Sequence, residues 1–229
     1  MAGERLTVII PVYNEEKTVG EIIRQVKAEV HQKQIIVVND GSTDNTEAVL
    51  RRFGDGELDI ISYQANRGKG YAIRQAILKA TGDIVIIQDA DLEYYPDEYG
   101  LLIDKIMQGK ADVVYGTRFV GSHRVFYFYH FLGNFILNMI ANLILNTTLS
   151  DLMTGAKACR AAVIKSLTRS ANRFGIEAEI TEEVFRRKYR VYEVPVSYSG
   201  RTYEEGKKIT WVDFFKSLAW LMRASFRKI

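Results

Sequence analysis

The stretch Ile84-Val85-Ile86-Ile87-Gln88-Asp89-Ala90-Asp91 is an apolar run that ends on two acids separated by one alanine. Such runs are typical of a strand buried on both faces of a sheet. The stretch predicts a strand over Ile84–Gln88 with Asp89 and Asp91 at its carboxyl end. Carboxylates placed there can hold a hard divalent cation, because oxygen ligands suit Mg²⁺ and Mn²⁺. The alternative is a surface turn with two solvated aspartates, which the preceding apolar run disfavours.

Strand-like and helix-like segments alternate on both sides of this stretch. Apolar runs predict strands at Leu6–Val12, Ile35–Val38, Leu58–Tyr63, Ile84–Gln88 and Val113–Tyr115. Helical patterns follow Asn14, cover about 45–53 and Gly68–Ala80, and begin near Pro96. This alternation predicts right-handed βαβ units and an α/β fold with a mostly parallel central sheet. Ligands of such sheets bind at the carboxyl ends of the strands.

Composition excludes several classes of protein. The chain has 229 residues, 47% of them hydrophobic and 26% charged, which is typical of a globular domain and not of a disordered chain. Its single cysteine, Cys159, excludes an intramolecular disulfide and fits a reducing compartment. The net charge of +3 is too small to indicate a nucleic-acid partner. Residues 201–229 hold seven basic and three acidic side chains, so the positive charge is concentrated there.

Polar motifs also follow the first two predicted strands. Pro11-Val12-Tyr13-Asn14-Glu15 places an aromatic ring, which could stack on a base, near a carboxylate. Asn39-Asp40-Gly41-Ser42 places Asp40 at another strand end, where it could accept a hydrogen bond from a base or a ribose. The plainer interpretations are a rim tyrosine and a turn that precedes a helix.

Four motifs in this order resemble the signatures of family 2 glycosyltransferases with the GT-A fold: the stretch 9–15, the stretch 37–44, Asn66-Arg67-Gly68-Lys69-Gly70, and Asp89-Ala90-Asp91-Leu92-Glu93. Within that family the chain is similar to the polyprenyl-phosphate sugar synthases, which include the dolichyl-phosphate mannose synthases. The resemblance implies an inverting transfer of a hexose, mannose or glucose, from a GDP- or UDP-sugar to dolichyl or undecaprenyl phosphate.

The resemblance also implies roles for individual residues. The nucleotide-contacting positions are matched by Pro11, Tyr13, Glu15 and Asp40. Asp89 and Asp91 match the motif for Mg²⁺ or Mn²⁺ and the diphosphate, Ala90 contributes backbone, and Glu93 stands as a third metal ligand where the synthases often carry glutamine. Phosphate-binding positions are matched by Arg118, Arg124, Arg201 and Lys207, with Arg118 and Arg201 counted with the two aspartates as catalytic.

The acceptor decides whether a general base is needed. A lipid phosphate is already anionic near pH 7, so its oxygen needs positioning and not deprotonation. A sugar or protein hydroxyl would need a base, for which Glu177 and Glu179 are the candidates. Transfer to such a hydroxyl is therefore the alternative activity. A non-catalytic nucleotide-sugar-binding protein at a membrane is the alternative of another class.

Two segments of the second half point to a membrane. Residues 125–150 hold no Asp, Glu, Lys or Arg, and Asn134, Asn138, Asn142 and Asn146 recur every fourth residue. This pattern predicts one or two helices that lie on a membrane or cover an acceptor groove; a helix buried against the sheet or a dimer partner is the alternative. Trp211–Phe226 predicts an amphipathic helix flanked by basic residues, suited to anionic lipid.

The expected organisation is a GT-A domain over residues 1–200, followed by a basic loop and an amphipathic helix over 201–229. We expect a peripheral protein at the cytoplasmic face of a membrane, with an integral-membrane partner or a second copy as possible companions. Shorter elements expected late in the chain are a strand at Gly155–Cys159, helices at Ala161–Leu167 and Thr181–Arg187, and an edge strand at Tyr192–Tyr198, because Pro195 interrupts it.

Overall fold

The structure is a computed structural model that describes residues 4–54, 56–125, 127–167, 175–202, 204–205 and 218–219. Lys207 and, apart from residues 218–219, the expected helix over Trp211–Phe226 lie outside these residues. The described elements are β1 (Leu6–Val12), α1 (Val19–Ala28), β2 (Lys33–Asp40), α2 (Thr46–Leu50), β3 (Asp59–Tyr63), α3 (Lys69–Lys79), β4 (Ile84–Ile87), the 3₁₀ turn η1 (Pro96–Glu98), α4 (Tyr99–Met107), β5 (Val113–Thr117), α5 (Phe128–Leu145), β6 (Lys157–Arg160), α6 (Ala161–Ser166), α7 (Ile176–Arg186) and β7 (Val191–Pro195).

The strands within the described ranges form one seven-stranded sheet in the order β3-β2-β1-β4-β6-β5-β7. The β1–β2, β1–β4, β2–β3 and β5–β7 pairs are parallel, whereas β6 runs antiparallel to both of its neighbours. The predicted α/β class with a mostly parallel sheet is therefore confirmed. The edge position predicted from Pro195 is confirmed as well, because β7 ends the sheet.

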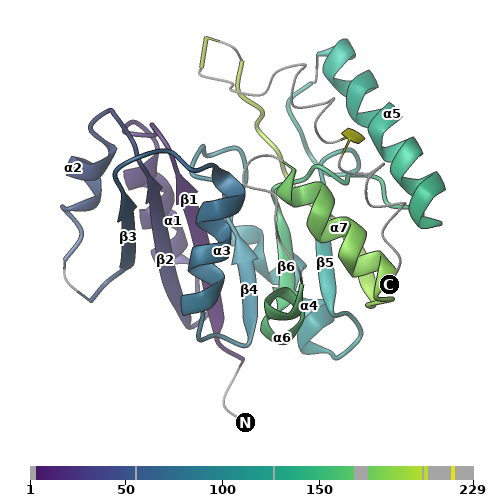
Figure 1. Cartoon of the computed structure of the whole chain (residues 1–229), viewed down its shortest axis with the longest axis horizontal. Helices are drawn as coiled ribbons and strands as arrows, with labels where there is room; N and C mark the ends of the chain where they lie inside the picture. The colour runs from purple at the N-terminus through teal and green to yellow at the C-terminus, as the bar shows by residue number, and fades with distance from the viewer. Residues whose placement is uncertain are drawn as a thin grey trace.

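Helices cover both faces of the sheet, as Figure 1 shows. Successive strand side chains point to opposite faces, so Val8 and Ile10 of β1 enter one core while Ile9 enters the other. The first core is completed by α1 and α4, and the second by α3, α6 and α7. Each fully buried large apolar side chain contributes roughly 1.5–3 kcal/mol, so these two layers hold the strand ends in place.

The predicted elements of the first half form, with boundary shifts of a few residues. The largest shift in the second half concerns α7, which begins at Ile176 and not at the predicted Thr181. Its first turn therefore contains Glu177 and Glu179, and both are buried. Acidic side chains are favourable there because they meet the positive end of the helix dipole.

The uncharged segment 125–150 forms the single helix α5, whose polar stripe faces the domain. The Asn142 side-chain amide donates to the Leu149 carbonyl at 2.8 Å, and Asn138 donates to the Ser150 carbonyl and accepts from the Leu152 amide at 2.8 Å. Asn146 ends the helix in a left-handed conformation with φ 51°. Two of the four asparagines, Asn138 and Asn142, thus fasten α5 to the segment 149–152.

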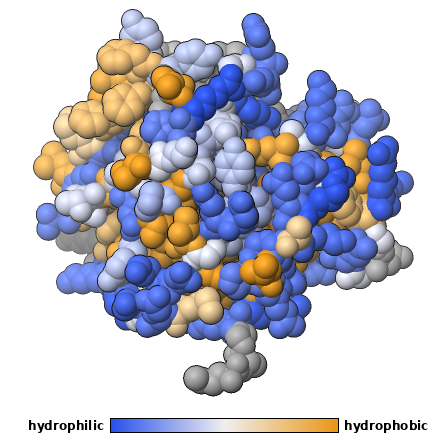
Figure 2. All heavy atoms as spheres, turned by 180° about the vertical axis from the view of Figure 1, so that it is seen from behind, coloured by the Kyte–Doolittle hydropathy of each residue, from blue (hydrophilic) through white to orange (hydrophobic). Residues whose placement is uncertain are grey.

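The opposite side of α5 is apolar and exposed. Exposure reaches 68% at Phe128 and 85% at Leu143. Figure 2 shows this group of apolar side chains at the upper left of the rear view. By length and composition α5 could cross a membrane, and it is the one described helix that meets this test. Its asparagine contacts instead fix it along the surface of the domain.

Candidate functional site

Asp89 and Asp91 lie directly after β4, whose neighbours are β1 and β6 in the middle of the sheet. Leu92 follows in a left-handed conformation with φ 62°, and the Glu93 amide donates to Asp91 Oδ1 at 3.2 Å. Burial raises the pKa of Asp91 to about 8, and the charges of Asp89 and Glu93 act in the same direction. Three carboxyl groups, Asp89, Asp91 and Glu93, here called the acid cluster, are therefore crowded together after one strand.

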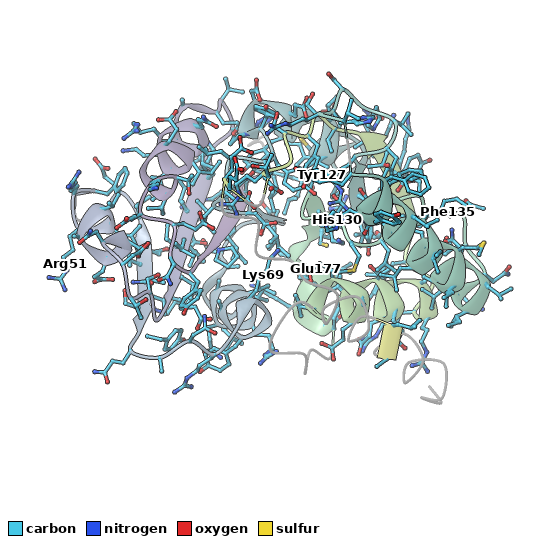
Figure 3. The ribbon with its side chains drawn as sticks, turned by 90° about the horizontal axis from the view of Figure 1, so that it is seen from above. Arg51, Lys69, Tyr127, His130, Phe135 and Glu177 are labelled. Carbon is cyan, nitrogen blue, oxygen red and sulfur yellow. The ribbon has the colours of Figure 1, made fainter. Side chains whose placement is uncertain are left out.

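Lys69 is ion-paired with Asp89 in this cluster, although no role was predicted for it. It is the first residue of α3, and its Nζ lies 2.7 Å from Asp89 Oδ1 and 2.9 Å from Glu177 Oε1. Figure 3 shows Lys69 and Glu177 facing each other from their two helices. Burial opposes the charge on Lys69, but Asp89 and Glu177 raise its pKa well above the usual range. Its place in the motif 66–70, at the start of a helix on the ligand-binding edge, was the available signal.

A glycine allows the closest approach in the site. A Cβ at Gly155 would lie 2.3 Å from Asp89 Oδ2, so a larger residue would displace that carboxylate. The turn that carries Gly155 is fastened by Lys157, whose Nζ donates to the carbonyls of Leu152 at 3.1 Å and of Thr154. Burial lowers the pKa of Lys157 to about 8. Asp89 is thus held between Lys69 on one side and this turn on the other.

Arg201 occupies the other half of the acid cluster. The segment 198–202, here called the strap, contacts Glu93 and carries Arg201. One guanidinium nitrogen of Arg201 lies 3.1 Å from Glu15 Oε2, and the other lies 3.3 Å from both Glu15 Oε1 and Asp91 Oδ2. Arg201 Nε lies 3.6 Å from Glu93 Oε1. The structure therefore brings together three residues predicted from separate motifs: Glu15, Asp91 and Arg201.

The loops after β1 and β2 are joined by hydrogen bonds. The Asn14 amide donates to Ser42 Oγ and the Glu15 amide to Thr46 Oγ1, both at 3.0 Å. Tyr13 is exposed at this rim, and Pro11 lies within β1. Asp40 is buried, and its two oxygens accept the amides of Arg67 at 2.9 Å and Gly68 at 2.6 Å. A nucleoside contact with Asp40 would use the remaining lone pairs of these oxygens.

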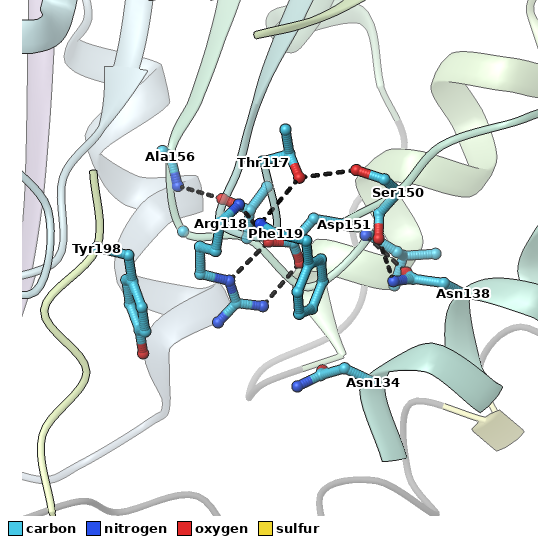
Figure 4. Close-up of polar contacts among 12 residues, drawn as sticks. Thr117, Arg118, Phe119, Asn134, Asn138, Ser150, Asp151, Ala156 and Tyr198 are labelled. Atoms are coloured by element: carbon cyan, nitrogen blue, oxygen red, sulfur yellow. Dashed lines mark hydrogen bonds and ion pairs between the residues drawn. The ribbon is translucent and has the colours of Figure 1, made fainter. Parts of the chain in front are cut away.

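Arg118 is held differently from what its expected phosphate-binding role implies. It is buried, and its Nε and Nη2 donate to Asp151 at 2.6 and 2.7 Å (Figure 4). Asp151 therefore uses two of the three guanidinium nitrogens and leaves Nη1 for another ligand. Arg124 contacts Glu205 at 2.8 Å and the Gly200 carbonyl at 3.3 Å, so it reaches the strap region.

The acid cluster fits a hard cation only if a substrate supplies further ligands. Among the described residues, no three His, Cys, Asp or Glu side chains converge as a complete metal site. Mg²⁺ in nucleotide enzymes takes one or two carboxylates from the protein and other oxygens from phosphates and water. Arg201 Nε is buried and finds no hydrogen-bond partner in the described part of the chain. Arg201 meets Asp91 at 3.3 Å through one nitrogen and keeps this Nε unsatisfied, so phosphate oxygens could add hydrogen bonds to the guanidinium.

Comparison with known proteins agrees with this geometry. A family model described as Glycosyl transferase family 2 matches residues 7–168. The curated dolichyl-phosphate hexose transferase of Haloferax volcanii is 28% identical over 200 residues, 87% of this chain and 85% of that protein. The dodecaprenyl-phosphate galacturonate synthase of Rhizobium johnstonii is 30% identical over 120 residues, 49% of this chain and 36% of that protein.

Solved structures share the fold. Glucosyl-3-phosphoglycerate synthase from Mycobacterium tuberculosis, in complex with Mn²⁺, UDP and phosphoglyceric acid, matches with a TM-score of 0.78 at 20% identity, over 100% of this chain and 81% of that chain. This likeness shows the GT-A fold. Together with a family model that spans well over half of the sequence, it establishes that this chain is a glycosyltransferase and belongs to glycosyl transferase family 2.

Proposed function

We propose that the protein transfers a hexose, mannose or glucose, from a nucleotide-diphosphate sugar to a polyprenyl phosphate, with inversion at the anomeric carbon. The observation that carries the proposal is a continuous run of contacts from the acid cluster to the apolar helix α5. The Tyr198 hydroxyl contacts Glu93, the Tyr198 ring contacts Arg118, and Phe119 contacts Phe131 of α5 at 5.7 Å between ring centroids. A phosphate at the cluster would therefore have an exposed apolar surface beside it for its lipid chain.

Donor binding is assigned to the edge formed by the β1, β2 and β4 ends. Tyr13, Glu15 and Asp40 would hold the nucleoside, and Asp89 and Asp91 would hold Mg²⁺ or Mn²⁺. The bound cation would neutralise charge that develops on the departing diphosphate. Lys69 and Arg201 already balance the two aspartates, so their positive charges remain beside the diphosphate when it binds. The Mn²⁺ and UDP bound by the mycobacterial synthase support this assignment.

Acceptor chemistry favours a lipid phosphate over a hydroxyl. Glu177 is ion-paired with Lys69, and Glu179 is buried in the same turn of α7. A general base must reach the proton that it abstracts, and the burial of Glu179 and the pairing of Glu177 Oε1 with Lys69 do not favour this. A phosphate oxygen needs no base, and Arg guanidinium groups match its geometry. Arg118 Nη1, Arg124, Arg201 and Lys207 are the candidate phosphate ligands.

We further propose a peripheral position at the cytoplasmic face of a membrane. The exposed apolar side of α5 would lie in the lipid interface, while its asparagine stripe stays on the domain. Amphipathic helices bind in this way through buried apolar area. An integral-membrane partner or a second copy could add to this attachment.

The test is a screen of donors and acceptors. The purified protein with Mg²⁺ or Mn²⁺ is offered UDP-glucose, GDP-mannose and other donors, with and without a short polyprenyl phosphate. We expect release of nucleoside diphosphate that requires the lipid phosphate. Asp91→Ala should abolish this release, whereas Asp97→Ala, at an exposed aspartate nearby, should not. Release that ignores the lipid phosphate and depends on Glu177 would favour the hydroxyl acceptor, and donor binding without turnover would favour a non-catalytic role.

A further inference from the structure

Tyr198 joins two parts of the site that the proposed function uses separately. Its hydroxyl donates to Glu93 Oε2 at 2.7 Å, and its ring lies 5.1 Å from the guanidinium carbon of Arg118. Its amide donates to the Ser122 carbonyl at 2.9 Å, and its carbonyl accepts the Arg124 amide at 3.0 Å. The side chain is only 7% exposed. Tyr198 is thus fixed on all sides at the start of the strap.

Glu93 receives three hydrogen bonds from the strap. Besides the Tyr198 hydroxyl on Oε2, the Arg201 amide donates to Oε1 at 2.8 Å, and the Ser199 amide donates to the Glu93 carbonyl at 3.0 Å. Both carboxylate oxygens are therefore engaged by the strap. The sequence predicts a third metal ligand at this position, and these hydrogen bonds leave fewer lone pairs of Glu93 for a cation.

The position of Arg201 depends on this attachment. An arginine side chain has several rotatable bonds, so its guanidinium reaches a fixed place only if its backbone is held. Glu93 holds the backbone amide of Arg201 while Glu15 and Asp91 receive the guanidinium. Leu92 is the one residue between Asp91 and Glu93, and its left-handed conformation bends the chain there. Asp91, which contacts the Arg201 guanidinium, and Glu93, which anchors the strap, thus belong to one turn.

We propose that Glu93 and Tyr198 are positioning residues that anchor the strap and so set Arg201 against Asp91, and that Glu93 does this in place of binding the cation. The inference rests on the proposed function in one respect, namely that Arg201 binds a substrate phosphate. The anchoring itself does not depend on that function. When a cation binds Asp91, the anchored strap keeps Arg201 nearby, where it can meet phosphate oxygens.

Limited proteolysis tests the anchor without any substrate. Trypsin can cleave after Arg201 only when the strap detaches from Glu93 and exposes this peptide bond. We expect cleavage at this bond, followed by mass spectrometry, to be at least about fivefold faster in Tyr198→Phe and Glu93→Ala. Tyr198→Phe keeps the ring on Arg118 and removes only the hydroxyl. Tyr99→Phe is the matched control, because it removes a buried hydroxyl that donates to Gln88 at 2.9 Å, away from the strap. Equal cleavage rates in all of these proteins would overturn the proposal.

Glu93→Gln separates the hydrogen bonds of Glu93 from its negative charge. Glutamine can still accept the Arg201 amide through its oxygen and can donate to the Tyr198 oxygen through its nitrogen. We therefore expect Glu93→Gln to be cleaved as slowly as the parent protein. Tyr198→Phe and Glu93→Ala should raise the KM for the polyprenyl phosphate about five- to tenfold and leave the donor KM within about twofold. A rise in the donor KM alone would contradict the proposal.

Mn²⁺ binding gives a readout whose sign differs between the two roles. It is measured by electron paramagnetic resonance with a nucleoside diphosphate present. If Glu93 anchors the strap, Glu93→Ala leaves the Mn²⁺ midpoint unchanged or lowers it, because Arg201 then competes less for Asp91. If Glu93 is a ligand, the midpoint rises, and that result would overturn the proposal. Failure of all glycosyl transfer would refute the proposed function while the cleavage and Mn²⁺ results still decide the anchor.

Discussion

Arg118 and Asp151 form a buried, two-pronged ion pair directly behind the acid cluster. Asp151 is 0% exposed, and it also accepts the Arg118 amide at 3.1 Å. The pair joins the end of β5 to the segment that returns from α5, so it fixes the two regions assigned to the acceptor. One guanidinium nitrogen, Nη1, is left over by Asp151. The pair therefore positions this nitrogen as well as stabilising the fold.

Asp151→Ala should be strongly destabilising. Removal of one partner leaves the Arg118 charge buried and unpaired, which costs about 3–5 kcal/mol. Urea unfolding measures this loss. The matched control is Asp112→Ala, because Asp112 makes a similar pair with the more exposed Arg190 at 2.8 Å. That variant should lose about 1 kcal/mol or less. If Asp151→Ala lost as little stability as Asp112→Ala, Arg118 would have to pair with another group in the variant.

Lys69→Met should lower activity strongly. The variant leaves Asp89 and Glu177 without their shared cation, so both the placement of Asp89 and the positive charge near the diphosphate are lost. Loss of one such pre-organised group lowers kcat by about 10²–10³. Lys79→Met, at an exposed lysine at the end of the same helix, should remain active. Steady-state kinetics of both variants test this expectation. A kcat of Lys69→Met comparable to that of Lys79→Met would exclude a catalytic role for Lys69.

The sequence predicted the strand ends and therefore most of the site. Apolar runs identify β1, β2 and β4 because these strands are buried on both faces, and the acids that follow them lie on the ligand edge. Lys69 was missed, because its partner Glu177 is 108 positions away and nothing local indicates that ion pair. The engagement of Arg118 by Asp151 and of Glu93 by the strap were missed for the same reason. Tertiary packing decides which charged side chains pair with each other, and the apolar pattern of the strands does not indicate these pairs.

The stability of the ligand-free protein should depend on the pKa of Asp91. Burial, with Asp89 and Glu93, raises this pKa to about 8, whereas an unfolded aspartate titrates near 3.9. The folded state therefore binds more protons between these values, and stability falls as pH rises through that window. Asp91→Asn should remove this slope. The difference in urea stability between parent and variant should change by at most about 1.4 kcal/mol per pH unit and level off above pH 8. A stability difference between parent and variant that stays constant from pH 5 to 9 would contradict the raised pKa of Asp91.

Gly155→Ala should impair catalysis through Asp89. The added Cβ would lie 2.3 Å from Asp89 Oδ2, so the carboxylate must shift from the position in which it meets Lys69. We expect kcat/KM to fall at least about tenfold, since small misplacements in a site are costly. Gly100→Ala is the control, because a Cβ in α4 meets nothing within 4 Å. That helix substitution should raise the melting temperature slightly. Full activity in Gly155→Ala would show that the turn yields and Asp89 does not.

The apolar side of α5 should carry the attachment to lipid. Charges at two of its exposed positions, in the double variant Phe135→Glu and Leu143→Glu, should reduce sedimentation with anionic phospholipid vesicles at least about tenfold, because each side chain loses apolar burial. Leu78→Glu, at an exposed leucine of α3, should bind as the parent does. Transfer to a short, water-soluble polyprenyl phosphate should be retained in the double variant, whereas transfer to a long-chain acceptor in vesicles should fall. Unchanged sedimentation, together with a smaller particle in gel filtration, would instead mean that a second copy of the chain covers this face.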